Sequence, residues 1–320
     1  MNTRQLEYVI AVAEERSFSK AADKLHISQP SLSQYIRNIE KSLEVNLFDR
    51  SVTPLSLTEI GEEYVKTAYR IIALENNLLK CISDQREKRK TTLNIGISAA
   101  LNTWEISLAL AEVRTKYPDT IINAHELFSI NMDDLLEQGE LDFSISPIND
   151  KYDMAHFSRD IILRDRMYLA ASRGVLKQNV PELADAVTGD TVKLSAFAQV
   201  PFFTLSTQSQ HALSFQKAVE GAGFSPNVIM RCRREEMLMD LVEKNVGVTL
   251  ISDRFLMDYN VKKDVVILKL IPQPPELVSA ISYLRGSHLT DAAKAFIKCY
   301  KRIVGDSRDA NGYLKDPYLS

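Results

Sequence analysis

Apolar and polar positions follow two different periods along the chain. Through about residue 90 the apolar residues recur at every third and fourth position, and only Pro30, Pro54 and Gly61 interrupt the pattern, which predicts a nearly all-helical segment. From Leu93 onward, short apolar runs alternate with helical stretches, as in a sheet whose strands are joined by crossover helices. We therefore expect a domain boundary between Lys90 and Leu93.

Three consecutive helices are expected at the start of the chain, over residues 4–15, 20–25 and 29–43. Thr3, Ser19 and Ser28 are the expected N-caps, because a side-chain oxygen at that position accepts a hydrogen bond from the first helical turn. Pro30 fits the first turn of the third helix, where its missing N–H would have no helical partner. A tight turn at His26 separates the two later helices, so the order is that of a helix-turn-helix.

The third helix separates its apolar residues from its polar ones. The apolar stripe consists of Leu32, Ile36, Ile39 and Leu43. The outward side consists of Gln29, Ser33, Gln34, Arg37 and Lys41. Glutamine pairs with adenine through two hydrogen bonds and serine bonds to several bases, so this side suits the reading of a DNA major groove. The alternative is an ordinary capped helix start whose polar residues face water.

The charge of this segment does not by itself favour nucleic acid. Residues 1–58 hold seven basic and seven acidic residues, whereas a DNA-binding domain usually has a basic excess. A phosphate-facing surface must therefore arise from arrangement, with Arg37, Lys41 and Arg50 on one side of the domain. The whole chain, with 39 basic and 42 acidic residues, has a net charge of −3.

Residues 4–50 and the LSLTEIG stretch after them resemble the amino-terminal domain of the LysR-type transcriptional regulators. The residues that carry the resemblance are Phe18, Ala21, Ala22, Ser28, Gln29 and Pro30, followed by Leu47, Phe48, Asp49 and Arg50. The resemblance implies a winged helix-turn-helix domain over residues 1–58 that binds double-stranded promoter DNA, with Arg50 near the DNA backbone at the wing. The DNA-binding residues expected on this basis are Gln29, Pro30, Ser31, Ser33, Gln34, Arg37 and Arg50.

Two positions depart from the family pattern. Glu44 stands where the family commonly has glycine at the end of the third helix, which bears on how that helix stops. Thr53 and Pro54 stand where a second wing arginine is frequent. Loss of that cation is expected to lower both the affinity for DNA and its salt dependence.

Residues 59–90 predict one long helix with an apolar stripe along it. The stripe consists of Ile60, Tyr64, Thr67, Ile71, Leu74, Leu78 and Cys81, at alternating spacings of four and three. We interpret it as the seam of a homodimer in preference to an intramolecular core, because no domain of the same chain is expected to cover it. The family resemblance implies antiparallel pairing of this helix and, beyond the dimer, a homotetramer.

The following segment, residues 91–305, predicts an α/β effector domain of two Rossmann-like subdomains. Segments crossing near Leu163 and Ile271 would join the two sheets and leave a cleft. Residues 93–320 hold 25 basic and 29 acidic residues, which argues against their embracing DNA. This part resembles the family's effector domain, which is itself similar to the periplasmic binding proteins. Residues 306–320, rich in Gly, Asp, Asn and Pro, are expected to form a tail.

Small polar residues are expected at the strand ends that face this cleft, because each hydroxyl residue follows a predicted strand. The expected effector-binding residues are Ser98, Ala100, Asn102, Ser129, Ser146 and Thr204. Converging hydroxyls and helix N-termini favour an anion, so the expected effector is a small carboxylate. The alternative is that each hydroxyl caps its own helix or turn.

No catalytic constellation is evident in the sequence. The five histidines are scattered singly, and no HExxH, GxSxG or phosphate-loop motif is present. The expected function is that of a ligand-responsive transcriptional regulator that needs no cofactor or metal, and not that of an enzyme. The alternatives are a small-molecule-binding protein and an α/β enzyme, each with a helical head.

Cysteine use and hydropathy favour a cytoplasmic protein. Cys81, Cys232 and Cys299 lie far apart without metal-ligand spacing, which favours reduced thiols. No apolar run reaches the roughly 18 residues of a membrane span, and the N-terminus lacks the organisation of a signal peptide.

The expected partners are promoter DNA, a small anionic effector and further copies of the chain, with RNA polymerase as a further candidate and no membrane.

Overall fold

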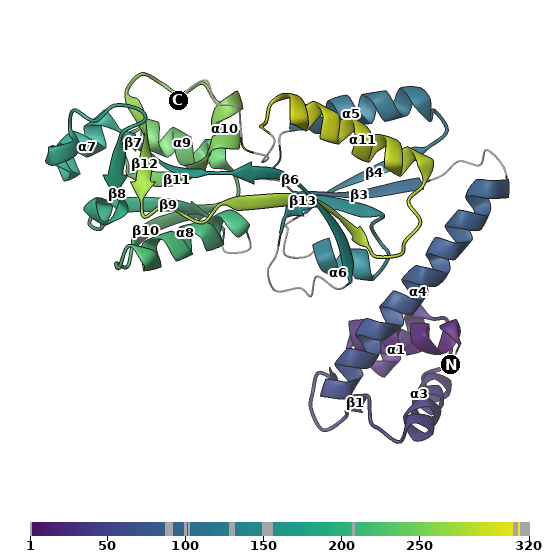
Figure 1. Cartoon of the computed structure of the whole chain (residues 1–320). Helices are drawn as coiled ribbons and strands as arrows, with labels where there is room; N and C mark the ends of the chain where they lie inside the picture. The colour runs from purple at the N-terminus through teal and green to yellow at the C-terminus, as the bar shows by residue number, and fades with distance from the viewer. Residues whose placement is uncertain are drawn as a thin grey trace. The chain divides into compact units, whose positions relative to one another are not determined.

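The computed structural model describes residues 2–86, 92–98, 101, 103–127, 132–148, 156–206, 209–309 and 313. The chain divides into two compact units. The first comprises Met1–Thr91, Asp134–Asp142 and Gly286–Thr290, and the second comprises Thr92–Asp133, Phe143–Arg285 and Asp291–Ser320. A long helix of the first unit ends at Arg86, and the strands of the second unit begin at Thr92 (Figure 1).

The first unit contains a three-helix core, a short strand pair and one long helix. Its elements are α1 (Thr3–Glu15), α2 (Phe18–Lys24), α3 (Gln29–Leu43), β1 (Phe48–Asp49), β2 (Ser56–Leu57) and α4 (Glu59–Arg86). β1 and β2 pair antiparallel, with Phe48 opposite Leu57, and form the wing. The predicted winged helix-turn-helix followed by a long helix is therefore confirmed.

The cap of α1 differs from the expected residue. Asn2, and not Thr3, precedes the helix, and its side chain accepts a hydrogen bond from the backbone N–H of Gln5 at 3.0 Å. The Gln5 side chain in turn accepts one from the backbone N–H of Asn2 at 3.0 Å, which completes a capping box. Because this reciprocal pair satisfies two N–H groups, Thr3 becomes the first helical residue.

The predicted cap of α2 is wrong, and the predicted cap of α3 is confirmed. Ser17, and not Ser19, caps α2, because its hydroxyl accepts from the backbone N–H of Lys20 at 3.4 Å. Ser28 caps α3 as predicted and accepts from the backbone N–H of Ser31 at 3.3 Å. The start of α3 is thus fixed by the residue that the sequence pointed to.

One apolar core holds α1, α2, α3 and the wing together. Ala21 of α2, Leu32 and Ile36 of α3, and Leu47 before the wing are fully buried in it. The small alanine side chain lets α2 approach its neighbours closely. The apolar stripe of α3 faces this core except at its end, where Leu43 is 42% exposed.

The first turn of α4 makes a close contact with the segment before the wing. Thr58 Oγ1 donates to the carbonyl oxygen of Asn46 at 2.7 Å and accepts from the backbone N–H of Gly61 at 3.0 Å. A Cβ atom on Gly61 would lie 2.0 Å from the carbonyl oxygen of Leu47, so the contact requires glycine. These contacts explain the threonine and the glycine of the LSLTEIG stretch.

The apolar stripe of α4 lies in two environments. Residues of its first half pack against Leu6 and Ile10 of α1: they are Tyr64, Val65, Ala68, Ile71 and Ile72. Leucines and isoleucine of the second half are each at least 41% exposed: they are Leu74, Leu78, Leu79 and Ile82. The expectation that no part of the chain covers this helix is wrong for its first half, because α1 lies against it.

The second unit is built on two β-sheets, one in each subdomain. The first subdomain contains β3 (Thr92–Ser98), α5 (Thr103–Lys116), β4 (Ile121–Leu127), β5 (Phe143–Pro147), β6 (Phe157–Asp165), β13 (Leu277–Leu284) and α11 (Asp291–Asp306). The second contains β7 (Met167–Ser172), α7 (Arg173–Asn179), β8 (Thr191–Lys193), β9 (Pro201–Leu205), α8 (Gln210–Gly221), β10 (Asn227–Cys232), α9 (Glu235–Glu243), β11 (Val248–Ser252), α10 (Asp253–Asp258) and β12 (Val265–Ile271). Two short 3₁₀ helices, η2 (Pro181–Leu183) and η3 (Leu194–Phe197), also belong to it, and α6 (Met132–Glu137) spans the division between the units after Asp133.

The first sheet has the strand order β4-β3-β5-β13-β6, and the second has the order β10-β9-β11-β7-β12-β8. β3 pairs in parallel with β4 and β5, as the strand–helix–strand pattern predicted. β13 and β6, for which no strand direction was predicted, are antiparallel to their neighbours. The physical reason is that both strands belong to the segments that pass to and from the second sheet. α5 and α11 cover the same face of the first sheet (Figure 1).

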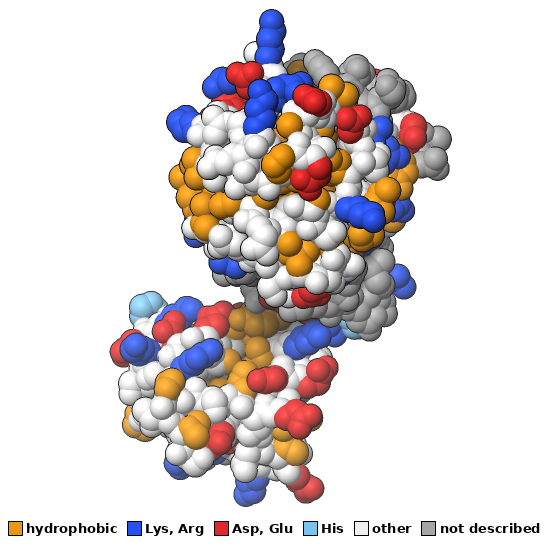
Figure 2. All heavy atoms as spheres, turned by 90° about the vertical axis from the view of Figure 1, so that its left-hand side faces the viewer, with side chains coloured by type: hydrophobic (Ala, Val, Ile, Leu, Met, Phe, Trp, Pro, Cys, Tyr) orange, Lys and Arg blue, Asp and Glu red, His pale blue; other side chains and the backbone are white. Residues whose placement is uncertain are grey.

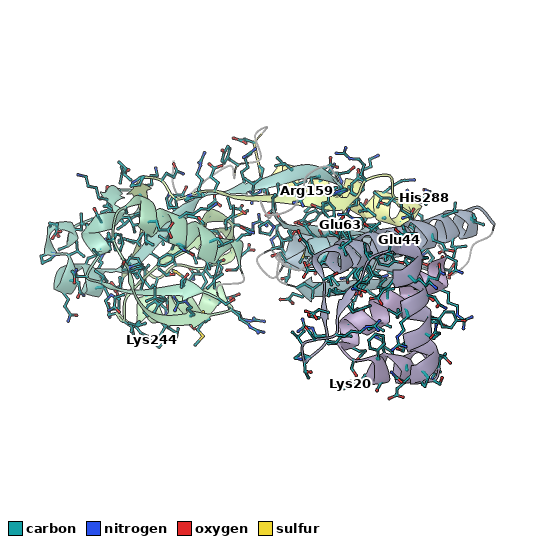
Figure 3. All side chains as sticks on the ribbon, turned by 90° about the horizontal axis from the view of Figure 1, so that it is seen from below. Lys20, Glu44, Glu63, Arg159, Lys244 and His288 are labelled. Atoms are coloured by element: carbon teal, nitrogen blue, oxygen red, sulfur yellow. The ribbon has the colours of Figure 1, made fainter. Side chains whose placement is uncertain are left out.

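Two extended segments connect the subdomains. β6 continues into β7 through Arg166, and β12 continues into β13 through residues 272–276. Both lie close to the crossing points predicted at Leu163 and Ile271. The two α/β subdomains predicted for this part of the chain are therefore confirmed, and Figure 3 labels one residue in each, Arg159 in the first and Lys244 in the second.

Part of the segment expected to be a tail lies against the second unit. The helix α11 ends at Asp306, and Tyr313 forms an isolated parallel bridge with Arg164 of β6. The Tyr313 hydroxyl donates to Glu276 Oε2 at 3.0 Å. Among the described residues, no helix has both the length and the apolar content of a membrane span.

Candidate DNA interface and effector site

α3 presents most of the predicted DNA-binding residues at the surface of the first unit. Burial of Leu32, Ile36 and Ile39 against the core orients the helix. The exposed members of the predicted set on α3 are Gln29, Pro30, Ser31, Gln34 and Arg37. Ser33 is half-buried at the edge of this face. The structure thus brings six of the seven predicted residues together on one helix.

Local hydrogen bonds orient two of these side chains. The hydroxyl oxygens of Ser28 and Ser31 lie 2.7 Å apart, so Ser31 takes part in the helix cap. Gln34 Nε2 donates to Asn38 Oδ1 at 3.0 Å, one helical turn further on. This bond leaves the carbonyl oxygen and one N–H of Gln34 for a base edge.

Two cations lie beside these residues. Arg37 and Lys41 are one turn apart on the exposed side of α3, and neither forms an ion pair with the described part of the chain. Lys24, in contrast, is paired with Glu14 at 2.7 Å. Figure 2 shows basic and acidic side chains interspersed over the visible face of this unit, without one continuous basic patch. Arg37 and Lys41 are therefore available to phosphate groups.

Arg50 has a structural partner inside the domain. Its Nη2 donates to Glu40 Oε2 at 2.6 Å, and its guanidinium lies over the ring of Phe18, 5.5 Å from the centroid. Glu40 is buried, and its other oxygen accepts from the backbone N–H groups of Leu47 and Phe48 at 2.9 and 3.3 Å. The contact of Arg50 with the DNA backbone stays a prediction, because this guanidinium also neutralises a buried carboxylate.

Sequence reasoning overlooked two exposed residues of α3. Tyr35 is 46% exposed and rests edge-on against Tyr8, with 5.2 Å between the ring centroids. Asn38 is exposed and bonded to Gln34. The spacing of four residues between Gln34 and Asn38 is a signal that could have identified Asn38, because residues so spaced share a helix face.

In the first subdomain, two predicted effector-binding residues lie side by side. Ser98 ends β3 and Ser146 lies in β5, and both are buried. The register pairs Ile97 with Ile145, which sets the two serines next to each other at the carboxyl edge of the sheet. The expectation that these serines follow their strands is wrong by one or two residues, because hydrogen bonding to neighbouring strands extends β3 and β5 through them. Ala100, Asn102 and Ser129 lie outside the described residues.

In the second subdomain, Thr204 lies in β9 and is buried, and its Oγ1 has no hydrogen-bond partner in the part of the chain that the structure describes. Alternate residues of a strand share a face, so Thr204 belongs to the face that carries Phe202. The Phe202 ring lies 5.5 Å from that of Phe215 in α8, so this face is the one that α8 covers. Thr204 therefore lies under the start of α8, near the carboxyl end of β9.

Sequence reasoning missed a pair at this end of the second sheet, formed by a buried histidine and a half-buried carboxylate. His211, in the first turn of α8, places Nε2 3.2 Å from Oε1 of Glu235, the first residue of α9. The hydroxyl of Ser252, at the end of β11, lies 3.5 Å from both carboxylate oxygens. The sequence gives no sign of this group, because each histidine stands alone in it. Only the fold brings His211, Glu235 and Ser252 together.

Two family models match the chain. The model described as "Bacterial regulatory helix-turn-helix protein, lysR family" matches residues 3–62, and the one described as "LysR substrate binding domain" matches residues 86–304. The second match alone spans more than half of the 320 residues.

Relatives of similar length are regulators by description. The uncharacterized HTH-type transcriptional regulator YcgK of Bacillus subtilis (strain 168) is 27% identical over 324 residues, which cover 97% of this chain and 97% of YcgK. The Hca operon transcriptional activator HcaR of Escherichia coli (strain K12) is 35% identical over 146 residues, 45% of this chain and 49% of HcaR.

Solved structures show the same fold at low identity. A full-length OxyR variant from Pseudomonas aeruginosa is 18% identical with a TM-score of 0.61, and the alignment covers 95% of this chain and 97% of that one. Full-length CbnR in complex with its target DNA is 18% identical with a TM-score of 0.53, covering 95% of this chain and 100% of CbnR. The chain belongs to the LysR family, whose members are DNA-binding transcriptional regulators with an effector-binding domain and not enzymes.

Proposed function

We propose that the exposed face of α3 enters the DNA major groove and reads bases through Gln29, Ser33 and Gln34. The support is geometric: the first turns of α3 are exposed and polar, while the opposite face is buried in the core. Arg37 and Lys41, which have no ion-pair partner in the described chain, contact phosphate groups beside the groove. Pro30 and Ser31 fix the start of the helix at the DNA surface.

Two copies of the chain pair through the second half of α4. The exposed residues there, Leu74, Leu78, Leu79 and Ile82, recur at spacings that place them along one broad side of the helix. Burial of this side against a second copy removes apolar surface from water, whereas the first half of α4 already rests on α1. Such dimers pair further into a tetramer, as the resemblance to the family implies.

The effector is a small anion held between the two subdomains. Ser98 and Ser146 offer hydroxyls at the carboxyl edge of the first sheet, and Thr204 offers one at the corresponding edge of the second. Ala100, Asn102 and Ser129 are further members of the proposed site. Binding of the anion biases the arrangement of the subdomains and thereby the spacing of the DNA-reading helices.

The observation that carries this proposal is the exposure of Gln29 and Gln34 on a helix whose other face is buried. We test it by measuring binding of the intact protein to DNA from upstream of its own gene and to a shuffled duplex of equal length. Replacing Gln29 and Ser33 by alanine is expected to abolish the preference for the upstream DNA while the protein stays oligomeric. Glu63→Ala, at an exposed position of α4 labelled in Figure 3, is the control and is expected to keep the preference. An unchanged preference in the double variant contradicts the assignment of α3.

The effector site is tested with a panel of small organic acids. At least one acid is expected to raise the melting temperature of the wild-type protein and to do so less in Thr204→Ala. Thr191→Ala, in the exposed edge strand β8, is the matched control and should respond like the wild type. Equal responses from all three proteins remove Thr204 from the proposed site.

A further inference from the structure

Buried ionisable side chains gather where the two subdomains join. They are Glu105 from α5, Asp165 from β6, Asp253 and Arg254 from α10, Tyr300 from α11 and Arg308 just beyond α11. Each is at most 5% exposed. α10 belongs to the second subdomain and the other elements belong to the first, and Figure 1 shows α10 next to one end of α11. These six residues are named the junction cluster here.

The junction cluster links α10 to the crossing strand β6 by ion pairs. Arg254 Nη2 is paired with Asp165 Oδ2, and Arg308 Nη2 lies 3.1 Å from Asp165 Oδ1. The backbone N–H of Asp253 donates to the carbonyl oxygen of Arg166, between β6 and β7, at 3.0 Å. A rotation of one subdomain against the other must stretch or break the two contacts of α10, because they join this helix of the second subdomain to the end of β6 and to Arg166.

The charges of the junction cluster do not balance when every member is ionised. It holds three carboxyl groups and two guanidinium groups, which leaves one negative charge in excess. An uncompensated charge is strongly disfavoured away from water, so one carboxyl group is expected to hold a proton. The carboxylate of Asp165 is already engaged by both arginines, which leaves Asp253 and Glu105 as the candidates.

Asp253 is the candidate that movement of the subdomains would affect. Its Oδ1 is buried and has no hydrogen-bond partner among the described residues. It faces the negative Asp165 and the positive Arg254 and Arg308, whereas Asp258, on the same helix, is exposed. Glu105 lies in the first subdomain together with Asp165 and Arg308, so opening of the junction would change only its charge interactions with Arg254 and Asp258 of α10.

The directions of the pKa shifts in the junction cluster agree with Asp253 as the group that holds the proton. Burial and the charge of Asp165 raise the pKa of Asp253 to about 7, although the two arginines act in the opposite direction. Burial also raises the pKa of Glu105. For Arg254, burial favours the neutral form, but the charges of Asp165, Tyr300 and Glu105 and the hydrogen bond to Asp165 together outweigh it and raise the pKa of the guanidinium, which stays positive.

We propose that the junction cluster is a proton-dependent latch, in which Asp253 holds a proton while α10 is docked and releases it to water when the subdomains move apart. Since the pKa of Asp253 is higher in the docked state than in the open state, docking is favoured at low pH and weakens as the pH rises. The open fraction is expected to rise by about tenfold per pH unit between about pH 5 and about pH 7, and to level off above that. The latch does not depend on the identity of the effector.

Hydrogen–deuterium exchange of the full-length protein tests this latch. Exchange is followed by mass spectrometry over that pH range, with labelling times scaled to the intrinsic exchange rate at each pH. Peptides from α10 are expected to lose protection as the pH rises, while peptides from α8 in the same subdomain keep theirs. Asp253→Asn is expected to make the protection of α10 independent of pH. Asp258→Asn, an exposed carboxyl on the same helix, is the matched control and should keep the wild-type response.

Three results would overturn the latch. The first is a wild-type α10 whose protection does not change with pH, and the second is an unchanged response in Asp253→Asn. The third is a response lost in Glu105→Gln, which would assign the proton to Glu105. If circular dichroism shows that Asp253→Asn does not fold, the pH dependence of exchange in the wild-type protein is the test. Joint loss of protection in α8 and α10 would then show unfolding of the subdomain and would overturn the latch.

Discussion

Glu40 and Arg50 form an ion pair with 2.6 Å between Oε2 and Nη2, and thereby connect the helix α3 to the wing. The other carboxylate oxygen accepts from the backbone N–H groups of Leu47 and Phe48. One buried side chain therefore satisfies two backbone donors and one cation. The position of the wing relative to α3 depends on this carboxylate.

We expect Glu40→Ala to lower the free energy of unfolding of the DNA-binding domain by about 2–4 kcal/mol, because it leaves two N–H groups and a guanidinium without their partner. Chemical denaturation of the full-length protein, followed by circular dichroism, measures the change. Glu7→Ala, an exposed acid of α1, is the control and should change stability by less than about 0.5 kcal/mol. Equal effects of the two substitutions would show that the Glu40 contacts do not stabilise the domain.

The local features of the first domain could be predicted because they depend on neighbours in sequence. Ser28 as a cap, the buried stripe of α3 and the close approach at Ala21 all follow from spacing and side-chain size. The ion pair between Glu40 and Arg50 could not be predicted, because the sequence around Glu40 does not distinguish it from the exposed acids of other helices. Its burial depends on the wing, which packs against it only in the folded domain. In the same way α1 covers half of α4, although 43 residues of sequence lie between the two helices.

Glu44→Gly is expected to stabilise the protein by about 0.5–1 kcal/mol. Glu44 ends α3 with φ of 58°, a left-handed conformation that costs a residue with a side chain about 1–2 kcal/mol, and the greater freedom of glycine in the unfolded chain cancels part of the gain. Thermal unfolding gives the comparison. Glu44→Ala keeps the strained backbone and should bring no gain, so equal stabilisation by alanine would contradict this explanation.

Gly61→Ala is expected to destabilise the junction of the wing and α4 by at least about 2 kcal/mol. The added Cβ would lie 2.0 Å from the carbonyl oxygen of Leu47, and backbone atoms cannot yield as a flexible side chain can. Gly221→Ala, at a position with nothing near the added carbon, serves as the control in the same thermal unfolding series. A variant at Gly61 as stable as the one at Gly221 would disprove the close approach.

Leu78→Asp is expected to shift the protein from oligomer toward monomer at micromolar concentration, because it places a charge in the centre of the proposed seam on α4. Analytical ultracentrifugation over a range of concentrations measures the shift. Val187→Asp introduces the same charge at an apolar residue of the second unit that is 53% exposed, and should leave association unchanged. Unaltered association of the Leu78 variant would exclude this part of α4 from the interface.

For the effector site, the sequence predicted the strands but only part of the polar residues at their ends. Ser98, Ser146 and Thr204 could be named because each lies near the end of an apolar run. His211 and Glu235 come from helices after different strands, so their pairing depends on the strand order of the second sheet. Strand order is set by tertiary packing, and no local pattern in the chain encodes it.

The DNA-reading role of α3 is tested by the affinity of the intact protein for DNA from upstream of its own gene, compared with a shuffled duplex, at several salt concentrations. We expect binding as an oligomer, at least about 10³-fold tighter to the upstream DNA, with affinity falling as salt rises. Replacing Arg37 and Lys41 by glutamine should weaken binding to both duplexes and flatten the salt dependence by about two released ions. A monomer with equal affinity for both duplexes would contradict both the DNA-reading role of α3 and the pairing of two copies through α4.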